Sequence, residues 1–227
     1  MALHSTPRLP STATRVATVA RYLFVDAARA QRALIPVVLY LVVLGILFAG
    51  DHTGAPGPWV ASVLVLYPAA AWIALTVANN EDPAQRAVTT ASAGGPGVVT
   101  GAILTVALAV DVVLALIPVA IPALISPGGF PPASLAAGGL AHVAAAVTGT
   151  AVGLVCARPV IARIGWSFAI TAAIVLITAV QPWLPPVGAS ARALSDPSAP
   201  VLLFNVALAL LLAVAAAATS WVVSRHR

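Results

Sequence analysis

Residues 98–119 read VVTGAILTVALAVDVVLALIPV and carry a single charged side chain, Asp111. A helix needs about 20 mostly apolar residues to cross the hydrocarbon core of a bilayer. Such a helix also satisfies its own backbone hydrogen bonds in a region where no water is available. This stretch therefore predicts a membrane-spanning helix.

The remainder of the chain has the same apolar character. Of its 227 residues, 61% are hydrophobic and 7% are charged, whereas soluble domains average about 25% charged residues. So few charged groups cannot cover a water-facing surface, which indicates an integral membrane protein. Glycine and proline clusters separate the apolar stretches. The predicted spans are residues 33–49, 59–78, 98–119, 134–157, 164–180 and 201–223.

The orientation of these spans follows from the arginines, since the chain contains eleven of them and no lysine. Six crossings would put ten arginines on one side and leave only Arg192 on the other. Basic residues stay in the cytoplasm, so both termini are predicted to be cytoplasmic. The expected fold is an all-α membrane protein with six transmembrane helices, N-in and C-in. A cleaved signal peptide is a poorer interpretation of the first span, because the basic region before it is too long.

Three segments are expected: a disordered terminus at residues 1–10, an amphipathic helix at residues 11–32, and a transmembrane domain at residues 33–227. In the amphipathic helix, the basic side chains share one arc with Tyr22 and Asp26, opposite an arc of valine, leucine and alanine. Such a helix lies at the head-group boundary. It either anchors the first span or also transmits force from a cytoplasmic partner. Its basic residues are Arg15, Arg21, Arg29 and Arg32.

The loop after the second span contains the signals of a short helix at residues 82–93. Asp82 stands at the N-cap, Pro83 at the first helical position, and Gln85 three residues after the cap. Gly94 can adopt the left-handed conformation that ends a helix. The helix either shapes the turn or docks another subunit, and the completeness of its caps favours docking.

This layout resembles the permease subunit of ABC-2-type transporters. The shared features are a basic amphipathic helix, six spans, a capped helix after span two, and the proline-rich residues 181–186 before the last span. The runs at residues 67–72 and 81–86 are similar to small actinobacterial members. The resemblance implies a coupling helix that contacts an ATPase through Glu81, Asp82, Gln85 and Arg86.

The resemblance further implies a permease subunit of an exporter in the bacterial cell membrane. The expected partners are separate ABC ATPase subunits, a second permease copy or homologue, and the lipid bilayer. ATP would be bound by the ATPase, so this chain is expected to need no cofactor and to be no enzyme. The alternatives are an accessory or structural subunit of another membrane complex, or an intramembrane enzyme.

Polar residues inside the spans suggest a translocation path. Asp111, His142 and Asn205 are the candidates, because polar and ionisable residues in a membrane are costly and mark pathways. Asp111 and His142 either pair along that path or make a structural contact between helices. Gly149 and Gly153 form a Gly-x-x-x-Gly pattern that indicates close helix packing. Tryptophans near the span ends are predicted interfacial anchors: Trp59, Trp166, Trp183 and Trp221.

Several functional classes lack the residues that they need. The single cysteine, Cys156, allows no disulfide within the chain and no cysteine metal cluster. The absence of lysine excludes a P-loop, and the histidines are too widely spaced for a zinc motif. The arginines lie beside apolar spans, so lipid head groups rather than nucleic acid are the expected partner.

Overall fold

The computed structural model describes residues 10–50, 57–125, 130–196 and 198–226, and these ranges contain nine α-helices and no strand. Most of the predicted disordered terminus and parts of two predicted turns lie outside the described residues. The helices are α1 (Thr12–Ala30), α2 (Leu34–Leu47), α3 (Gly57–Asn79), α4 (Pro83–Ala93), α5 (Pro96–Ile125), α6 (Pro132–Cys156), α7 (Ile164–Ala179), α8 (Val187–Ala193) and α9 (Ala199–Arg225).

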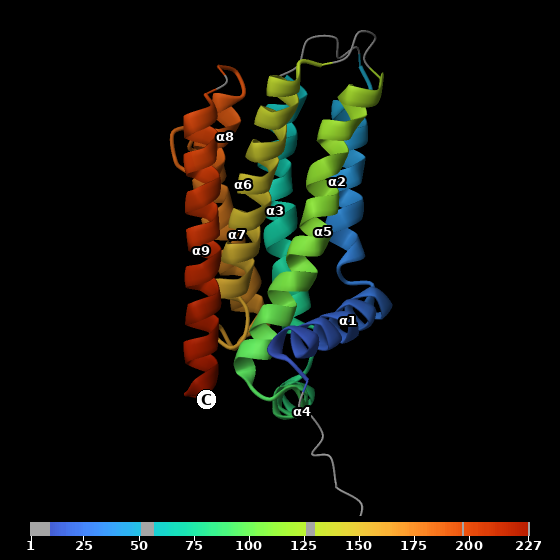
Figure 1. Ribbon diagram of the computed structural model, residues 1–227, viewed down its shortest axis with the longest axis vertical. Coiled ribbons are helices and arrows are strands. Elements are labelled where there is room, and N and C mark those ends of the chain that lie inside the picture. Colours follow the sequence, from blue (N-terminus) through green and yellow to red (C-terminus); the bar gives the residue numbers. More distant parts are fainter. Residues whose placement is uncertain (1–9, 51–56, 126–129, 197, 227) are drawn as a thin grey trace, which may run out of the picture.

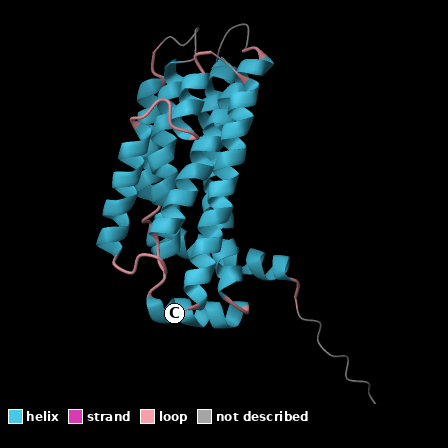
Figure 2. Cartoon of the chain, turned by 90° about the vertical axis from the view of Figure 1, so that its left-hand side faces the viewer, coloured by secondary structure: helices cyan, strands magenta, loops and turns pink. Residues whose placement is uncertain are grey.

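The long helices run side by side in one elongated bundle (Figure 1). α1 and α4 cross one end of this bundle, and the C-terminal end of α9 lies there too. We call this the α4 end, and the opposite end, which carries α8, the α8 end. A view turned by 90° shows that the body of the bundle consists of helices (Figure 2). The two described chain ends therefore share one side of the bundle, as the prediction of two cytoplasmic termini requires.

The predicted all-helical membrane character is confirmed, but the number of spans is confirmed only in part. α3, α5, α6 and α9 are long and apolar enough to cross a bilayer. α1 and α2, bent by 74° at their junction, would together make a fifth candidate. α7 has 16 residues, which gives roughly 24 Å of helix against about 30 Å of hydrocarbon. The six-span count stays a prediction.

The centre of the bundle is the pair α3 and α6, which is the most extensive helix contact of the described chain. Small residues allow these helices to approach closely, as in other membrane bundles. At Gly149 and Gly153 an added Cβ would lie 2.5 Å from the carbonyl oxygen of Tyr67 and 2.3 Å from that of Ala71. The predicted close packing is therefore confirmed, and α3 is its partner.

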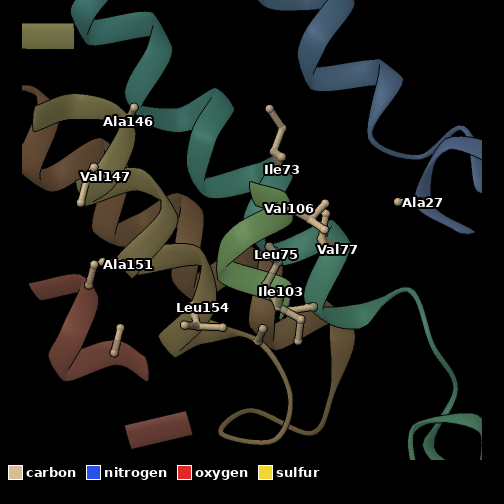
Figure 3. Packing of buried hydrophobic residues seen from close by; sticks show 14 of the residues in the cluster. Ala27, Ile73, Leu75, Val77, Ile103, Val106, Ala146, Val147, Ala151 and Leu154 are labelled. Carbon is tan, nitrogen blue, oxygen red and sulfur yellow. The ribbon is translucent and has the colours of Figure 1, made fainter. Parts of the chain in front are cut away.

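Around this pair the core consists mainly of aliphatic side chains, with Tyr40, Trp59 and Tyr67 also buried, while the outer helices turn large apolar side chains outward. α2 and α9 are the clearest examples, with exposed leucines and valines along much of their length. Lipid is the environment in which such surfaces are stable. Figure 3 shows core residues from four helices: Ala27 from α1, Ile73, Leu75 and Val77 from α3, Ile103 and Val106 from α5, and Ala146, Val147, Ala151 and Leu154 from α6.

Two prolines inside α5 leave backbone carbonyls without their usual donors, because proline has no N–H to offer four residues back. Pro118 frees the carbonyl of Leu114, which accepts a hydrogen bond from the Tyr40 hydroxyl (3.4 Å). Pro122 frees the carbonyl of Pro118, which accepts from the Trp59 indole N–H (2.8 Å). Trp59 is thus a buried hydrogen-bond donor and not the interfacial anchor that the sequence predicts.

The arginines are distributed over the two ends of the bundle as the topology prediction requires. Arg15, Arg86, Arg158 and Arg225 lie on α1, α4, the α6–α7 connection and the end of α9, all at the α4 end. Arg192 lies on α8 at the other end. The orientation of the bundle in the membrane stays a prediction.

Candidate functional site

The candidate site is the assembly of α1 and α4 at the α4 end, and α4 itself is defined by its caps. The Asp82 carboxylate accepts a hydrogen bond from the Gln85 main-chain N–H (2.8 Å). Pro83 opens the helix, and Gly94 ends it in the left-handed region with φ of 85°. The Gly95 N–H closes the end on the Thr90 carbonyl (3.0 Å). The predicted helix is confirmed, with bounds within one residue.

A capping box has two hydrogen bonds, one from the Gln85 main-chain N–H to the Asp82 side chain and one from the Asp82 main-chain N–H to the Gln85 side chain. Only the first of them forms. The Gln85 side chain does not return to its own helix start but donates from Nε2 to the Tyr22 hydroxyl of α1. Just before α4, Asn80 donates to the carboxylate of Asp26, also on α1. At the other end of α4, Arg15 donates to the Ala93 carbonyl (3.4 Å). Three polar contacts thus hold α4 and its entry against α1.

α1 has the predicted N-cap and the predicted two arcs. Ser11 accepts from the Thr14 N–H (3.2 Å), and the helix ends at Ala30, two residues before the predicted boundary. The apolar arc, represented by Leu23 (1% exposed), packs into the protein core against α5. The sequence predicts instead that this arc enters the head-group layer. The correction has a simple cause: apolar surface is buried equally well by protein, and α5 is the neighbour.

The four basic residues of the predicted amphipathic helix have different environments, and Arg32 lies just beyond the end of α1. Arg15 is half-buried and reaches Thr12 and Ala93. Arg21, Arg29 and Arg32 are exposed. Their positions suit contact with phosphates or with an acidic partner surface, and of these four only Arg15 takes part in the α1–α4 contact.

The four predicted coupling residues also divide into two groups. Asp82 and Gln85 are exposed, whereas Glu81 is 2% exposed and Arg86 is half-buried. Glu81 accepts a hydrogen bond from the Thr89 hydroxyl (2.5 Å). Arg86 donates to the Ala78 carbonyl (2.8 Å), one of the last carbonyls of α3 that no helical N–H can reach. Both therefore face inward: Arg86 fastens α4 to the end of α3, and Glu81 ties α4 to the α3–α4 connection.

Burial is the main influence on the Arg86 side chain. It lowers the pKa of the guanidinium, because a charged group loses hydration there; nearby Glu81 raises this pKa, and nearby Arg158 lowers it. Two guanidinium groups therefore influence each other at this position. Sequence reasoning missed this proximity because Arg86 and Arg158 lie on separate connections of the bundle.

A groove runs between α1 and α4 on the outer side of the assembly. Its volume is about 510 Å³. Val88, which is 69% exposed, lies on its α4 wall, and Val19 and Tyr22 lie on its α1 wall. This groove lies at the surface of the α1–α4 assembly and presents the exposed Val88 side chain.

Of the two alternatives for Asp111 and His142, the structure has no pair, and each side chain makes a structural contact with another helix instead. Asp111 accepts a hydrogen bond from the Thr150 hydroxyl of α6. His142 contacts the Ser62 hydroxyl of α3 (2.8 Å) and the Gly138 carbonyl (2.7 Å). Thr150 and His142 are eight residues apart on α6, roughly 12 Å along its axis. Asp111 and His142 are fully buried, so neither lines an open path in this conformation.

Asn205, the third predicted path residue, is also buried, at 1% exposed. Its amide nitrogen and oxygen have no hydrogen-bond partner among the described residues. It belongs to the buried face of α9, a helix that packs against α5, α6 and α8. Among the threonines of the spans, Thr105 and Thr148 donate to carbonyls of their own helices, whereas Thr150 donates across to Asp111 of α5.

A double-mutant cycle tests the reassigned partners. Asp111→Leu and Thr150→Val should couple by about 0.5–3 kcal/mol in unfolding free energy, since each removes one end of the same buried hydrogen bond. Asp111→Leu and His142→Phe should add to within about 0.5 kcal/mol, because the sites share no partner. Unfolding in mixed micelles, followed by circular dichroism, measures both. Coupling of Asp111 with His142 but not with Thr150 would restore the predicted pair.

Comparisons with protein-family models, curated proteins and solved structures find no match to this chain. Function is therefore inferred from the residues and from their geometry. The elements that the geometry singles out are a doubly capped helix outside the bundle, its contacts with α1 and α3, and the groove beside it.

Proposed function

We propose that this chain is the membrane-spanning permease subunit of an ATP-driven ABC exporter that works with separate ATPase subunits. One observation carries the proposal: α4, capped at both ends by its own sequence, lies outside the apolar bundle and is tied to it by polar contacts. A connecting loop needs no such construction. A helix that receives force from a partner must be both rigid and fastened to what it moves.

The contacts around α4 give such a force two routes into the bundle. One passes through Gln85 and Tyr22 to α1, and from Leu23 of α1 into the core against α5. The other passes from Arg86 directly to the end of α3. Because α3 is the helix most tightly packed on α6, displacement of α4 would reach the centre of the bundle.

In the proposed mechanism the ATPase subunits bind ATP and close, and this closure pushes α4 and α1. The groove beside Val88 would receive a segment of the ATPase. The spans would then switch between inward and outward openings, together with a second permease copy or homologue. This arrangement places the α4 end in the cytoplasm, where ATP is available, and this chain itself would bind no nucleotide.

The test is co-purification of the full-length chain from its native membranes in mild detergent, with mass spectrometry to identify ATPases and an assay of ATP hydrolysis. Val88→Asp should reduce the amount of ATPase that co-purifies with the chain at least tenfold, because it puts a charge into the proposed interface. Val180→Asp is the matched control, since Val180 is equally exposed (71% against 69%) but far from α4.

Three outcomes are distinguishable. Loss of the co-purifying ATPase with Val88→Asp but not with Val180→Asp supports the permease role. An ATPase that stays bound and active with Val88→Asp points to an accessory subunit of another complex. Recovery of the wild-type chain without any ATPase would contradict the proposal.

A further inference from the structure

A cavity at the α4 end has no part in the proposed transport cycle. It has a volume of about 650 Å³, within the range of roughly 300–1,000 Å³ that is usual for small-molecule sites. α4, the first turn of α5, the α6–α7 connection and the end of α9 form its walls. Its lining combines alanines, prolines and one valine with five polar side chains: Glu81, Arg86, Thr90, Arg158 and Ser224.

The charged groups of the cavity are not balanced. Two guanidinium groups face one carboxylate, so the lining carries one excess positive charge. Arg158 is held in place through its main chain, whose N–H donates to the Asn79 side chain (3.0 Å). Its side-chain Nε, however, is buried with no hydrogen-bond partner among the described residues. A buried charged donor without a partner is costly unless a ligand supplies one.

The single carboxylate does not remove this imbalance. One oxygen of Glu81 accepts from Thr89, and the other, Oε2, is buried without a hydrogen-bond partner in the described chain. Arg86 uses one of its nitrogens on the Ala78 carbonyl. The two guanidinium groups therefore keep donors for an incoming acceptor, and Thr90 and Ser224 add hydroxyl groups to the same lining.

We propose that this cavity binds a phosphate ester. Arg86 and Arg158 donate hydrogen bonds to the phosphate oxygens, and the apolar walls surround the organic group to which the phosphate is attached. Arginine favours phosphate because its planar fork donates two parallel hydrogen bonds. Basic pockets between membrane helices take anionic lipid head groups in the same way. The apolar walls favour an anionic phospholipid of the surrounding bilayer over a soluble phosphate. The proposal does not depend on the transporter function.

The test uses the purified full-length chain and three arginine variants. Native mass spectrometry counts the lipids that stay bound after exchange into nanodiscs of phosphatidylglycerol or of phosphatidylcholine. The wild-type chain should retain one molecule of phosphatidylglycerol. Arg158→Gln should retain this lipid at least tenfold less. Arg158→Lys should fall between them, because it keeps the charge but not the fork. Arg163→Gln is the matched control: the same charge change on the same connection, outside the cavity.

A second arm identifies the source of the phosphate. Millimolar inorganic phosphate, added to lipid-depleted chain in neutral detergent, should leave the thermal midpoint unchanged if the ligand is a lipid. A rise in the wild-type midpoint that Arg158→Gln abolishes would assign the site to a soluble phosphate instead.

Two results would overturn the proposal. One is equal retention of phosphatidylglycerol by wild type, Arg158→Gln and Arg163→Gln, which marks non-specific lipid. The other is binding of neither probe. If Arg158→Gln does not fold, Ala91→Phe serves in its place, because it fills the cavity from an apolar wall without changing a charge. It should displace the phosphatidylglycerol, and unchanged retention would count against the site.

Discussion

Gly153→Ala is expected to destabilise the chain by about 1–3 kcal/mol, the usual range for an overpacked core. The added Cβ would lie 2.3 Å from the Ala71 carbonyl oxygen and 2.9 Å from the Ala74 Cβ. The first of these neighbours is backbone, which cannot turn away as a side chain can. The helices α3 and α6 must therefore separate, and they form the central contact of the bundle. Equilibrium unfolding in mixed micelles measures the effect.

The matched control is Gly139→Ala on the same helix, where an added Cβ meets nothing within 4 Å. This control should be neutral or slightly stabilising, because alanine has the higher helix propensity. Ala74→Gly should not rescue Gly153→Ala, since the clash with the Ala71 carbonyl remains. Equal unfolding curves for Gly153→Ala and Gly139→Ala would show that α3 and α6 are not in close contact.

Trp59→Phe is expected to cost about 1–3 kcal/mol through the loss of a single hydrogen bond, because it leaves the Pro118 carbonyl buried and unsatisfied. Loss of the ring contact with Phe130, whose centroid lies 5.4 Å away, adds a packing cost. The two contributions separate in a double-mutant cycle with Pro122→Ala. Alanine at position 122 supplies the N–H that Pro122 lacks, so the Pro118 carbonyl regains a donor within α5.

In the Pro122→Ala background Trp59→Phe should therefore cost only the packing contribution. The expected coupling is about 0.5–3 kcal/mol. Trp183→Phe, at an exposed position, controls for the general effect of losing an indole. The same cost of Trp59→Phe in both backgrounds would mean that the indole does not replace the missing proline donor.

The sequence predicts the structure correctly where the interactions that decide it join residues close together in the chain. The caps of α4 depend on Asp82, Pro83 and Gly94 and on their immediate neighbours, so spacing alone located the helix. The two arcs of α1 follow from its 3.6-residue period in the same way. The apolar stretches predicted the ends of the long helices to within two residues, except that α5 continues to Ile125, six residues beyond the predicted end of its span.

Partners across helices were not predictable. Asp111 meets Thr150 rather than His142, because depth in a membrane says nothing about which faces of two helices meet. Trp59 lies near a span end, as an interfacial anchor does. Its indole N–H is nevertheless buried, because it donates to the Pro118 carbonyl of α5, which has no donor within its own helix. The Gly-x-x-x-Gly pattern was visible, yet small residues are common throughout this chain, and only the structure identifies α3 as its partner.

The amino-acid sequence alone predicts that this chain is helical and embedded in lipid, because about 20 apolar residues in a row have no other stable environment. It also determined the position of α4, since a helix end is set by the residues next to it. The three-dimensional structure was needed to show that α1 packs into the core and that Arg86 faces inward beside Arg158. The physical reason is that burial and pairing depend on segments far apart in the chain, and no periodicity or spacing records which of them meet.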